Sequence, residues 1–143
     1  MTVPQRLSMV TLGVTDVARS TAFYESLGWR RSSASQDAIT FFTMQGSVLG
    51  LFGRGDLAAD VGVPAAGDGF RGVTVALNCD RRDEVDAVFA EWVAAGATPV
   101  KPPEAVFWGG YSSYVADPDG HLWEIAHNPY SPNDEHGRMR LPD

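Results

Sequence analysis

Cysteine is nearly missing from this sequence, and its scarcity limits the chemistry open to the chain. Among 143 residues Cys79 is the one cysteine, so an intramolecular disulfide and a cysteine-based zinc cluster are both excluded. No histidine or lysine stands near Cys79 in the sequence, and we interpret it as a structural residue. We expect a cytoplasmic protein, because this cysteine content does not call for an oxidising compartment.

Basic residues are scarce as well. Lys and Arg number 11 against 18 Asp and Glu, which gives a net charge of −7. The basic residues are scattered, and their longest runs are the pairs at 30–31 and 81–82. Binding of a phosphate backbone needs clustered Lys and Arg. We therefore expect no nucleic-acid partner.

Long apolar runs are also lacking. A helix that spans a bilayer takes about 20 apolar residues, and no run approaches that length. The first residues, MTVPQRLSMV, lack the charged and apolar regions of a signal peptide. With 44% apolar and 20% charged residues, the composition is typical of a soluble globular domain. We expect no membrane partner.

The sequence does contain one order of elements, used twice. LSMVTLGV at 7–14 predicts a strand, and the next segment predicts a helix with Asp16 as N-cap and Gly28 at its left-handed end. Gln45-Gly46 predicts a hairpin turn between two later strands. These short β-rich runs lie at 29–32, 38–44 and 47–53.

The second half repeats this order. A strand is predicted at 72–78, and a helix follows with Asp80 as its cap and Gly96 at its end. Three more strands are predicted at 97–103, 111–116 and 121–127. The repeated βαβββ order predicts an α+β fold of paired modules. We expect one domain, 1–143, with module one at 7–53, a linker at 54–71, module two at 72–129 and a C-terminal tail at 130–143.

The two hairpins predict which side chains share a face. A two-residue turn at 45–46 pairs Phe41 with Gly50 and puts Phe52 on their face. For the second hairpin, a loop of two or four residues puts Tyr111 and Ser113 on the face of Glu124, whereas a three-residue loop breaks this assignment.

Glu124 stands out in its strand. Its neighbours Trp123 and Ile125 form a bulky apolar face that we expect to pack on the helices. Glu124 then lies on the opposite face. An unpaired buried carboxylate is costly, so this side chain has solvent, a polar partner or a metal.

Two motifs carry a family resemblance: TLGVTDVARSTAFYESLGW in the first module and WGGYSSYVADPDGHLWEIAHNP in the second. The DPDGH turn and the WE after it are the most specific part. From Leu7 to Pro129 the chain resembles the vicinal-oxygen-chelate superfamily of glyoxalase I, bleomycin-resistance proteins, fosfomycin-resistance enzymes and extradiol dioxygenases. The resemblance implies paired βαβββ modules that form a cupped, partly open eight-stranded mixed sheet around one cavity. It also implies a homodimer.

The resemblance further implies four positions for metal ligands, carried over to Met9, Gly50, Val73 and Glu124. Only Glu124 has ligand chemistry, whereas a catalytic divalent metal needs about three imidazole or carboxylate ligands. By strand parity His121 and His127 lie on the face opposite Glu124. We therefore expect no catalytic metal and no cofactor.

Our leading hypothesis is a protein that binds a small, partly apolar organic molecule in the cup. The predicted apolar walls are Phe41, Phe52 and Trp108, and the predicted polar anchors are Tyr111, Ser113 and Glu124. The acidic chain favours a basic or neutral ligand over an anion.

Two alternatives stay open. One is a metal-dependent lyase, isomerase or dioxygenase in which Glu124 is the catalytic base or a metal ligand. The other is a non-catalytic partner module whose dimer surface is its function.

The polar tail after Pro129 is either frayed or laid across a partner subunit.

Overall fold

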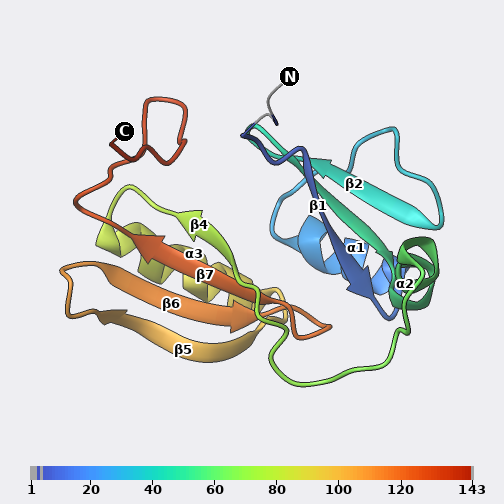
Figure 1. Ribbon diagram of the computed structural model, residues 1–143. Helices are drawn as coiled ribbons and strands as arrows, with labels where there is room; N and C mark the ends of the chain where they lie inside the picture. The colour runs from blue at the N-terminus through green and yellow to red at the C-terminus, as the bar shows by residue number, and fades with distance from the viewer. Residues whose placement is uncertain (1–2, 4, 143) are drawn as a thin grey trace. The chain divides into compact units, whose positions relative to one another are not determined.

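The chain forms two compact units in a computed structural model that describes residues 3 and 5–142 (Figure 1). The first unit is Met1–Asp68 and the second unit is Gly69–Asp143. Each unit has a mixed sheet with a long helix against it, so the predicted α+β class is confirmed. None of the helices in the described residues is long and apolar enough to span a membrane.

The sheet of the first unit has three strands in the order β1-β3-β2. They are β1 (Met9–Val14), β2 (Ile39–Thr43) and β3 (Val48–Gly53). The predicted hairpin turn is confirmed, because Met44 N donates to Ser47 O at 2.9 Å and Gly46 has φ 88°. The strand predicted at 29–32 was wrong, since Arg31 forms only an isolated bridge to Phe42.

Helix α1 (Val17–Ser26) covers one face of this sheet. Its start is as predicted, because the Asp16 side chain accepts a hydrogen bond from Arg19 N at 3.1 Å. The core on this side is aromatic: the ring of Tyr24, fully buried, lies 5.6 Å from that of Trp29 and 6.1 Å from that of Phe42. Burial of these rings fixes which sheet face is turned to the helix.

The segment at 54–71 was predicted to be a linker, but it contains helix α2 (Arg54–Val61). This helix packs on β1 and β3, with Leu57 Cδ2 3.4 Å from the point that a Cβ on Gly13 would occupy. Arg54 then ties down the following loop, because Nε donates to Ala65 O at 2.8 Å and Nη2 to Gly67 O at 2.9 Å. Gly13 of β1 therefore permits the close approach of α2, and the two hydrogen bonds of Arg54 hold the loop that follows this helix.

The sheet of the second unit has four strands in the order β4-β7-β6-β5. They are β4 (Val75–Asn78), β5 (Thr98–Ala105), β6 (Tyr111–Ala116) and β7 (Leu122–His127). As in the first unit, the first strand pairs in parallel with the last one, and the other pairs are antiparallel. The described residues thus hold seven named strands, not eight.

Helix α3 (Arg82–Ala94) covers one face of the second sheet. The buried Trp92 on this helix lies 5.1 Å, ring to ring, from Trp123 of β7. The predicted cap was wrong: Arg81 holds the N-cap position, without a side-chain hydrogen bond. Instead the Glu84 carboxylate accepts from Asp80 N at 3.3 Å.

The C-terminal tail contacts residues of its own unit. Asn133 Nδ2 donates to Asn78 O at 2.9 Å and to Asp80 Oδ1 at 3.1 Å. Asp134 Oδ1 accepts from the backbone N of His136 and of Arg138, at 2.9 Å each. The start of the tail is therefore held at the end of β4, and contact with a partner subunit stays a prediction.

Candidate functional site

The turn between β6 and β7 determines which side chains share a face. Asp117 N donates to His121 O at 2.9 Å, so the loop between them has three residues. An odd loop inverts the parity expected from a two- or four-residue loop. The register accordingly pairs Tyr114 with Glu124. The expected face assignment was wrong for this reason.

Tyr111 and Ser113 lie on the α3 side of the sheet, not beside Glu124. Ser113 is fully buried, and its hydroxyl donates to Ile125 O at 2.9 Å. The Tyr111 hydroxyl donates to Asp86 Oδ1 on α3 at 2.8 Å. Their predicted place next to Glu124 as polar anchors was therefore wrong.

The face of the second sheet turned away from α3 carries a row of four residues, one from each strand. In the order of the strands these are Ala76, Glu124, Tyr114 and Lys101. The Tyr114 hydroxyl donates a hydrogen bond to the Glu124 carboxylate. The Lys101 ammonium lies 2.9 Å from Glu104 Oε1. A tyrosine–carboxylate pair therefore occupies the middle of this face.

The surroundings of Tyr114 raise the pKa of its hydroxyl. Burial is the largest cause, and the negative charge of Glu124 and the hydrogen bond to it add to the effect, while Lys101 opposes it. Tyr114 therefore keeps its proton at neutral pH and acts as the donor. Glu124 keeps lone pairs that are able to accept from a ligand.

Sequence reasoning missed Tyr114. The sequence Pro118-Asp119-Gly120 also fits a three-residue loop. A loop of that length puts Tyr114 opposite Glu124. Gly120 has φ 82°, and a left-handed glycine at the end of a three-residue hairpin loop is a common arrangement.

The corresponding face of the first sheet, turned away from α1, is apolar and crowded. The register confirms that Phe41 lies opposite Gly50. A Cβ on Gly50 would lie 3.3 Å from Thr11 Oγ1 and 3.5 Å from Met9 Sδ. Gly50 thus makes room for the side chains of the neighbouring strand. Phe41 and Phe52 are partly exposed on this face.

The residues at the positions implied for metal ligands do not fit a catalytic divalent metal. In the first unit these are Met9 and Gly50, and the strand neighbour of Gly50 is Thr11. In the second unit Val73 precedes β4, and Ala76 is the strand neighbour of Glu124. Within the described residues of either unit, no group of three or more His, Cys, Asp and Glu side chains is placed to hold a metal ion. Glu124 alone offers a suitable oxygen.

The remaining groups of interest for catalysis serve local structure. His127 Nδ1 lies 3.1 Å from Cys79 O, and His121 Nδ1 lies 2.9 Å from Nη1 of Arg71. Burial raises the pKa of the Cys79 thiol to about 11, and the charge of Glu84 adds to this effect. The thiol is therefore protonated at neutral pH and a poor nucleophile.

Trp108 lies in the turn between β5 and β6. Its ring lies directly over Gly110, where any Cβ would overlap the ring. The neighbouring Phe107 is fully exposed. Contact of Trp108 with a ligand stays a prediction.

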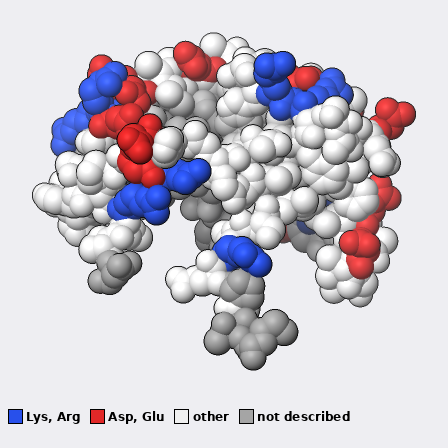
Figure 2. Space-filling view, turned by 90° about the horizontal axis from the view of Figure 1, so that it is seen from above, with Lys and Arg blue, Asp and Glu red and all other residues white. Residues whose placement is uncertain are grey.

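Several basic side chains are already paired with carboxylates. Figure 2 shows acidic side chains beside basic ones on the face in view. Arg81 lies 3.0 Å from Asp83 and 2.8 Å from Glu84, and Arg31 lies 3.1 Å from Glu25. These pairs lower the positive potential that an anionic partner needs.

The chain matches the model of the Glyoxalase/Bleomycin resistance protein/Dioxygenase superfamily over residues 6–125. The chain belongs to this superfamily. No curated protein sequence gives a significant match.

Solved structures agree with this assignment. A glyoxalase-related enzyme from Fulvimarina pelagi is 35% identical, with a TM-score of 0.86 over 98% of this chain and 100% of the other. A lactoylglutathione lyase from Agrobacterium tumefaciens is 25% identical, with a TM-score of 0.66 over 88% of this chain and 96% of the other. A superfamily enzyme from Burkholderia phytofirmans PsJN is 20% identical and shares the fold, with a TM-score of 0.76 over 85% of this chain and 98% of the other.

Proposed function

We propose that the protein binds a small, partly apolar organic molecule at Tyr114 and Glu124, without a catalytic metal. The observation that carries the proposal is the hydrogen-bonded pair on the face turned away from α3. The pair offers a carboxylate that accepts hydrogen bonds and a tyrosine ring that contributes apolar surface.

The neighbours of the pair on this face of the sheet have small side chains. Ala76 is beside Glu124, and Ser112 and Ala126 form the next cross-strand pair on the same face. Ligand sites commonly combine a few polar groups with apolar surroundings. The roles of Phe41, Phe52 and Trp108 as apolar ligand contacts stay predictions from the sequence.

The charge of the site favours a neutral or basic ligand. Glu124 is an acceptor, and the chain carries a net charge of −7. The one nearby cation of the row, Lys101, is held by Glu104. An anionic ligand would meet repulsion from Glu124 without a free cation in this row to offset it.

The test is a thermal-shift screen of small amines and neutral aromatic compounds, together with native mass spectrometry of the purified protein. We expect a stabilising compound that loses its effect on Glu124→Gln. The matched control is Glu91→Gln, because Glu91 is an exposed carboxylate on α3. Equal stabilisation of wild type and Glu124→Gln, or no stabilising compound, contradicts the proposal.

The second candidate function is an enzyme that moves a proton, with Glu124 as base. It is favoured by the neutral Tyr114 hydroxyl beside the carboxylate, because such a donor stabilises a developing negative charge. The similarity to a lactoylglutathione lyase fits this class. Metal analysis of the purified protein separates the two candidates: a stoichiometric divalent metal that is lost in Glu124→Gln favours the enzyme and overturns metal-free binding.

We also infer a homodimer, from the resemblance to the family. Light scattering coupled to size-exclusion chromatography tests it, and a mass of one chain would contradict it.

A further inference from the structure

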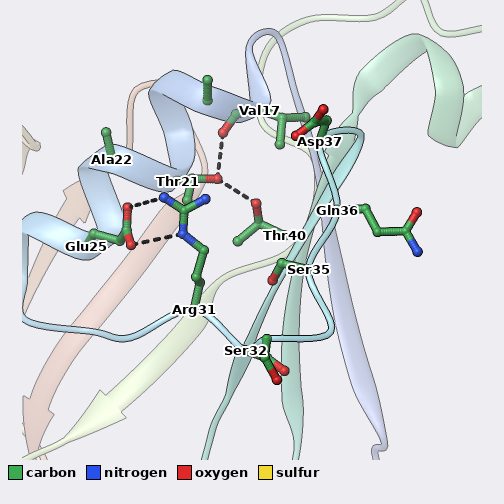
Figure 3. A pocket seen from close by; sticks show the side chains of 12 residues that line it. Val17, Thr21, Ala22, Glu25, Arg31, Ser32, Ser35, Gln36, Asp37 and Thr40 are labelled. Atoms are coloured by element: carbon green, nitrogen blue, oxygen red, sulfur yellow. Dashed lines mark hydrogen bonds and ion pairs between the residues drawn. The ribbon is translucent and has the colours of Figure 1, made fainter.

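A polar groove of about 480 Å³ lies in the first unit. It runs between α1 and residues 31–37, and the start of β2 forms its floor (Figure 3). This volume is typical of small-molecule sites. We propose that the groove is a second ligand site, for a small molecule that combines an ammonium group with hydroxyls, such as an amino sugar or amino alcohol.

The floor of the groove accepts hydrogen bonds. Thr21 and Thr40 are almost fully buried, and their hydroxyl oxygens lie 2.8 Å apart. Thr21 Oγ1 donates its single proton to Val17 O at 2.7 Å, so Thr40 is the donor between the two threonines. The lone pairs of Thr40 are left to accept a hydrogen bond from a ligand hydroxyl or amine. Figure 3 shows both hydroxyls in the middle of the groove.

The two ends of the groove differ in charge. At one end Arg31 Nε and Nη2 each donate to a different carboxylate oxygen of Glu25, at 3.1 Å. This bidentate pair neutralises both charges. At the other end lies Asp37, next to Val17 in Figure 3, and among the described residues no ion pair involves it. The remaining charge of the groove is therefore negative, and it favours an ammonium group near Asp37.

The outer wall is already ordered for binding. Phe41 N donates to Ser35 Oγ at 2.9 Å, and Gln36 N donates to Ile39 O at 2.8 Å. Ser32 N donates to Phe41 O at 2.7 Å. The loop is thus pinned to β2 at three places. A wall that is ordered before binding loses less conformational entropy when a ligand arrives.

The helical wall also offers small apolar side chains. Val17, Ala18 and Ala22 line it between the polar groups. From Val17 to Glu25 it extends for about 12 Å, given a rise of 1.5 Å per residue. A sugar ring matches such a wall, because its C–H face contacts small apolar side chains while its hydroxyls reach the threonines.

The test uses glucosamine in its protonated form, titrated into ¹⁵N-labelled protein and followed by backbone amide shifts. We expect saturable shifts at residues 32–37 and Thr40, and weaker or no shifts with uncharged N-acetylglucosamine. Asp37→Asn and Thr40→Val should each raise the dissociation constant by about five- to tenfold, as for the loss of one hydrogen bond.

The matched control is Asp60→Asn, because Asp60 is an exposed carboxylate on α2 outside the groove. It should leave the dissociation constant unchanged. The absence of saturable shifts in the groove overturns the proposal, and so does equal binding of N-acetylglucosamine or unchanged binding by Asp37→Asn. Asp37 is exposed, so its variant decides the outcome even where Thr40→Val fails to fold. Glu124→Gln should bind glucosamine in the groove as wild type does, which separates this site from the proposed function.

Discussion

The two units repeat one order of elements, yet they differ on the sheet face turned away from the long helix. In the first unit this face holds Gly50 beneath Thr11 and Met9, with Phe41 on the neighbouring strand. In the second unit the corresponding face presents Tyr114 and Glu124. The polar chemistry of these faces thus belongs to one unit, although both have the same topology.

The helix sides of the two sheets are alike. Each buries large aromatic rings between helix and sheet: Tyr24 against Phe42 in the first unit, and Trp92 against Trp123 in the second. Apolar burial on this side is what stabilises each unit, and it constrains the far face only through strand register. The far face is therefore able to diverge in chemistry while the fold is kept.

The largest effect is expected on the helix side. Trp123→Ala should lower the free energy of unfolding by about 3–5 kcal/mol, because it leaves a large cavity against Trp92. Urea denaturation measures the loss. Phe107→Ala is the control, because Phe107 is fully exposed and should change stability by less than about 0.5 kcal/mol. Similar losses for both variants would contradict the assigned core.

An intermediate loss of stability is expected at the helix starts, where the two units differ in their N-caps. Asp16→Ala should cost about 1 kcal/mol, because it removes the acceptor for Arg19 N at the start of α1. Asp80→Ala should cost less, because Arg81 holds the cap position of α3 without a side-chain bond. Thermal unfolding of the two variants measures both effects. A larger loss for Asp80→Ala would reverse this comparison.

The crowding around Gly50 is expected to produce a smaller effect. Gly50→Ala places a Cβ 3.3 Å from Thr11 Oγ1, which forces the strands apart or the threonine to shift. The substitution should cost about 0.5–1 kcal/mol more in the wild-type background than in Thr11→Ala. A double-mutant cycle, with stability measured by urea denaturation, gives the coupling free energy between Gly50→Ala and Thr11→Ala. Additive effects would show that Thr11 does not crowd Gly50.

The smallest effect on stability is expected at the Tyr114–Glu124 pair, and it appears at high pH. The pKa of Tyr114 is raised in the folded state, whereas an unfolded tyrosine has a pKa of about 10. Above that pH the unfolded chain releases the proton first, so the stabilisation present at lower pH is lost as the pH rises through the folded value.

Absorbance of tyrosinate, taken as the difference between wild type and Tyr114→Phe, measures this titration. Glu124→Gln should lower the pKa of Tyr114, because the carboxylate raises it through its charge and its hydrogen bond. An unchanged titration in Glu124→Gln would show that the pair does not form in solution.

Local sequence signals predicted several elements correctly. The Asp16 cap, the left-handed Gly28 and the Gln45-Gly46 turn are all present. Each depends on the conformational preferences or hydrogen-bonding groups of adjacent residues, so the residues themselves carry the information. The family motifs led correctly to the superfamily.

The site was harder to predict, because it depends on loop parity. Side chains alternate along a strand with a period of two, so a turn with one residue more or fewer inverts every later pairing. DPDG is compatible with several loop lengths, and the hydrogen bond from Asp117 N to His121 O selects three residues. With this loop length Ser113 lies on the α3 side of the sheet, and Tyr114 lies opposite Glu124.

The residues alone determined the order of elements, the family and the presence of one mid-strand carboxylate, because these follow from local preference and pattern. The partner of that carboxylate, the packing of α2 on its sheet and the groove above Thr21 and Thr40 follow from contacts between residues far apart in the chain. Tertiary packing decides such contacts, since they depend on the burial of whole faces rather than on neighbouring residues.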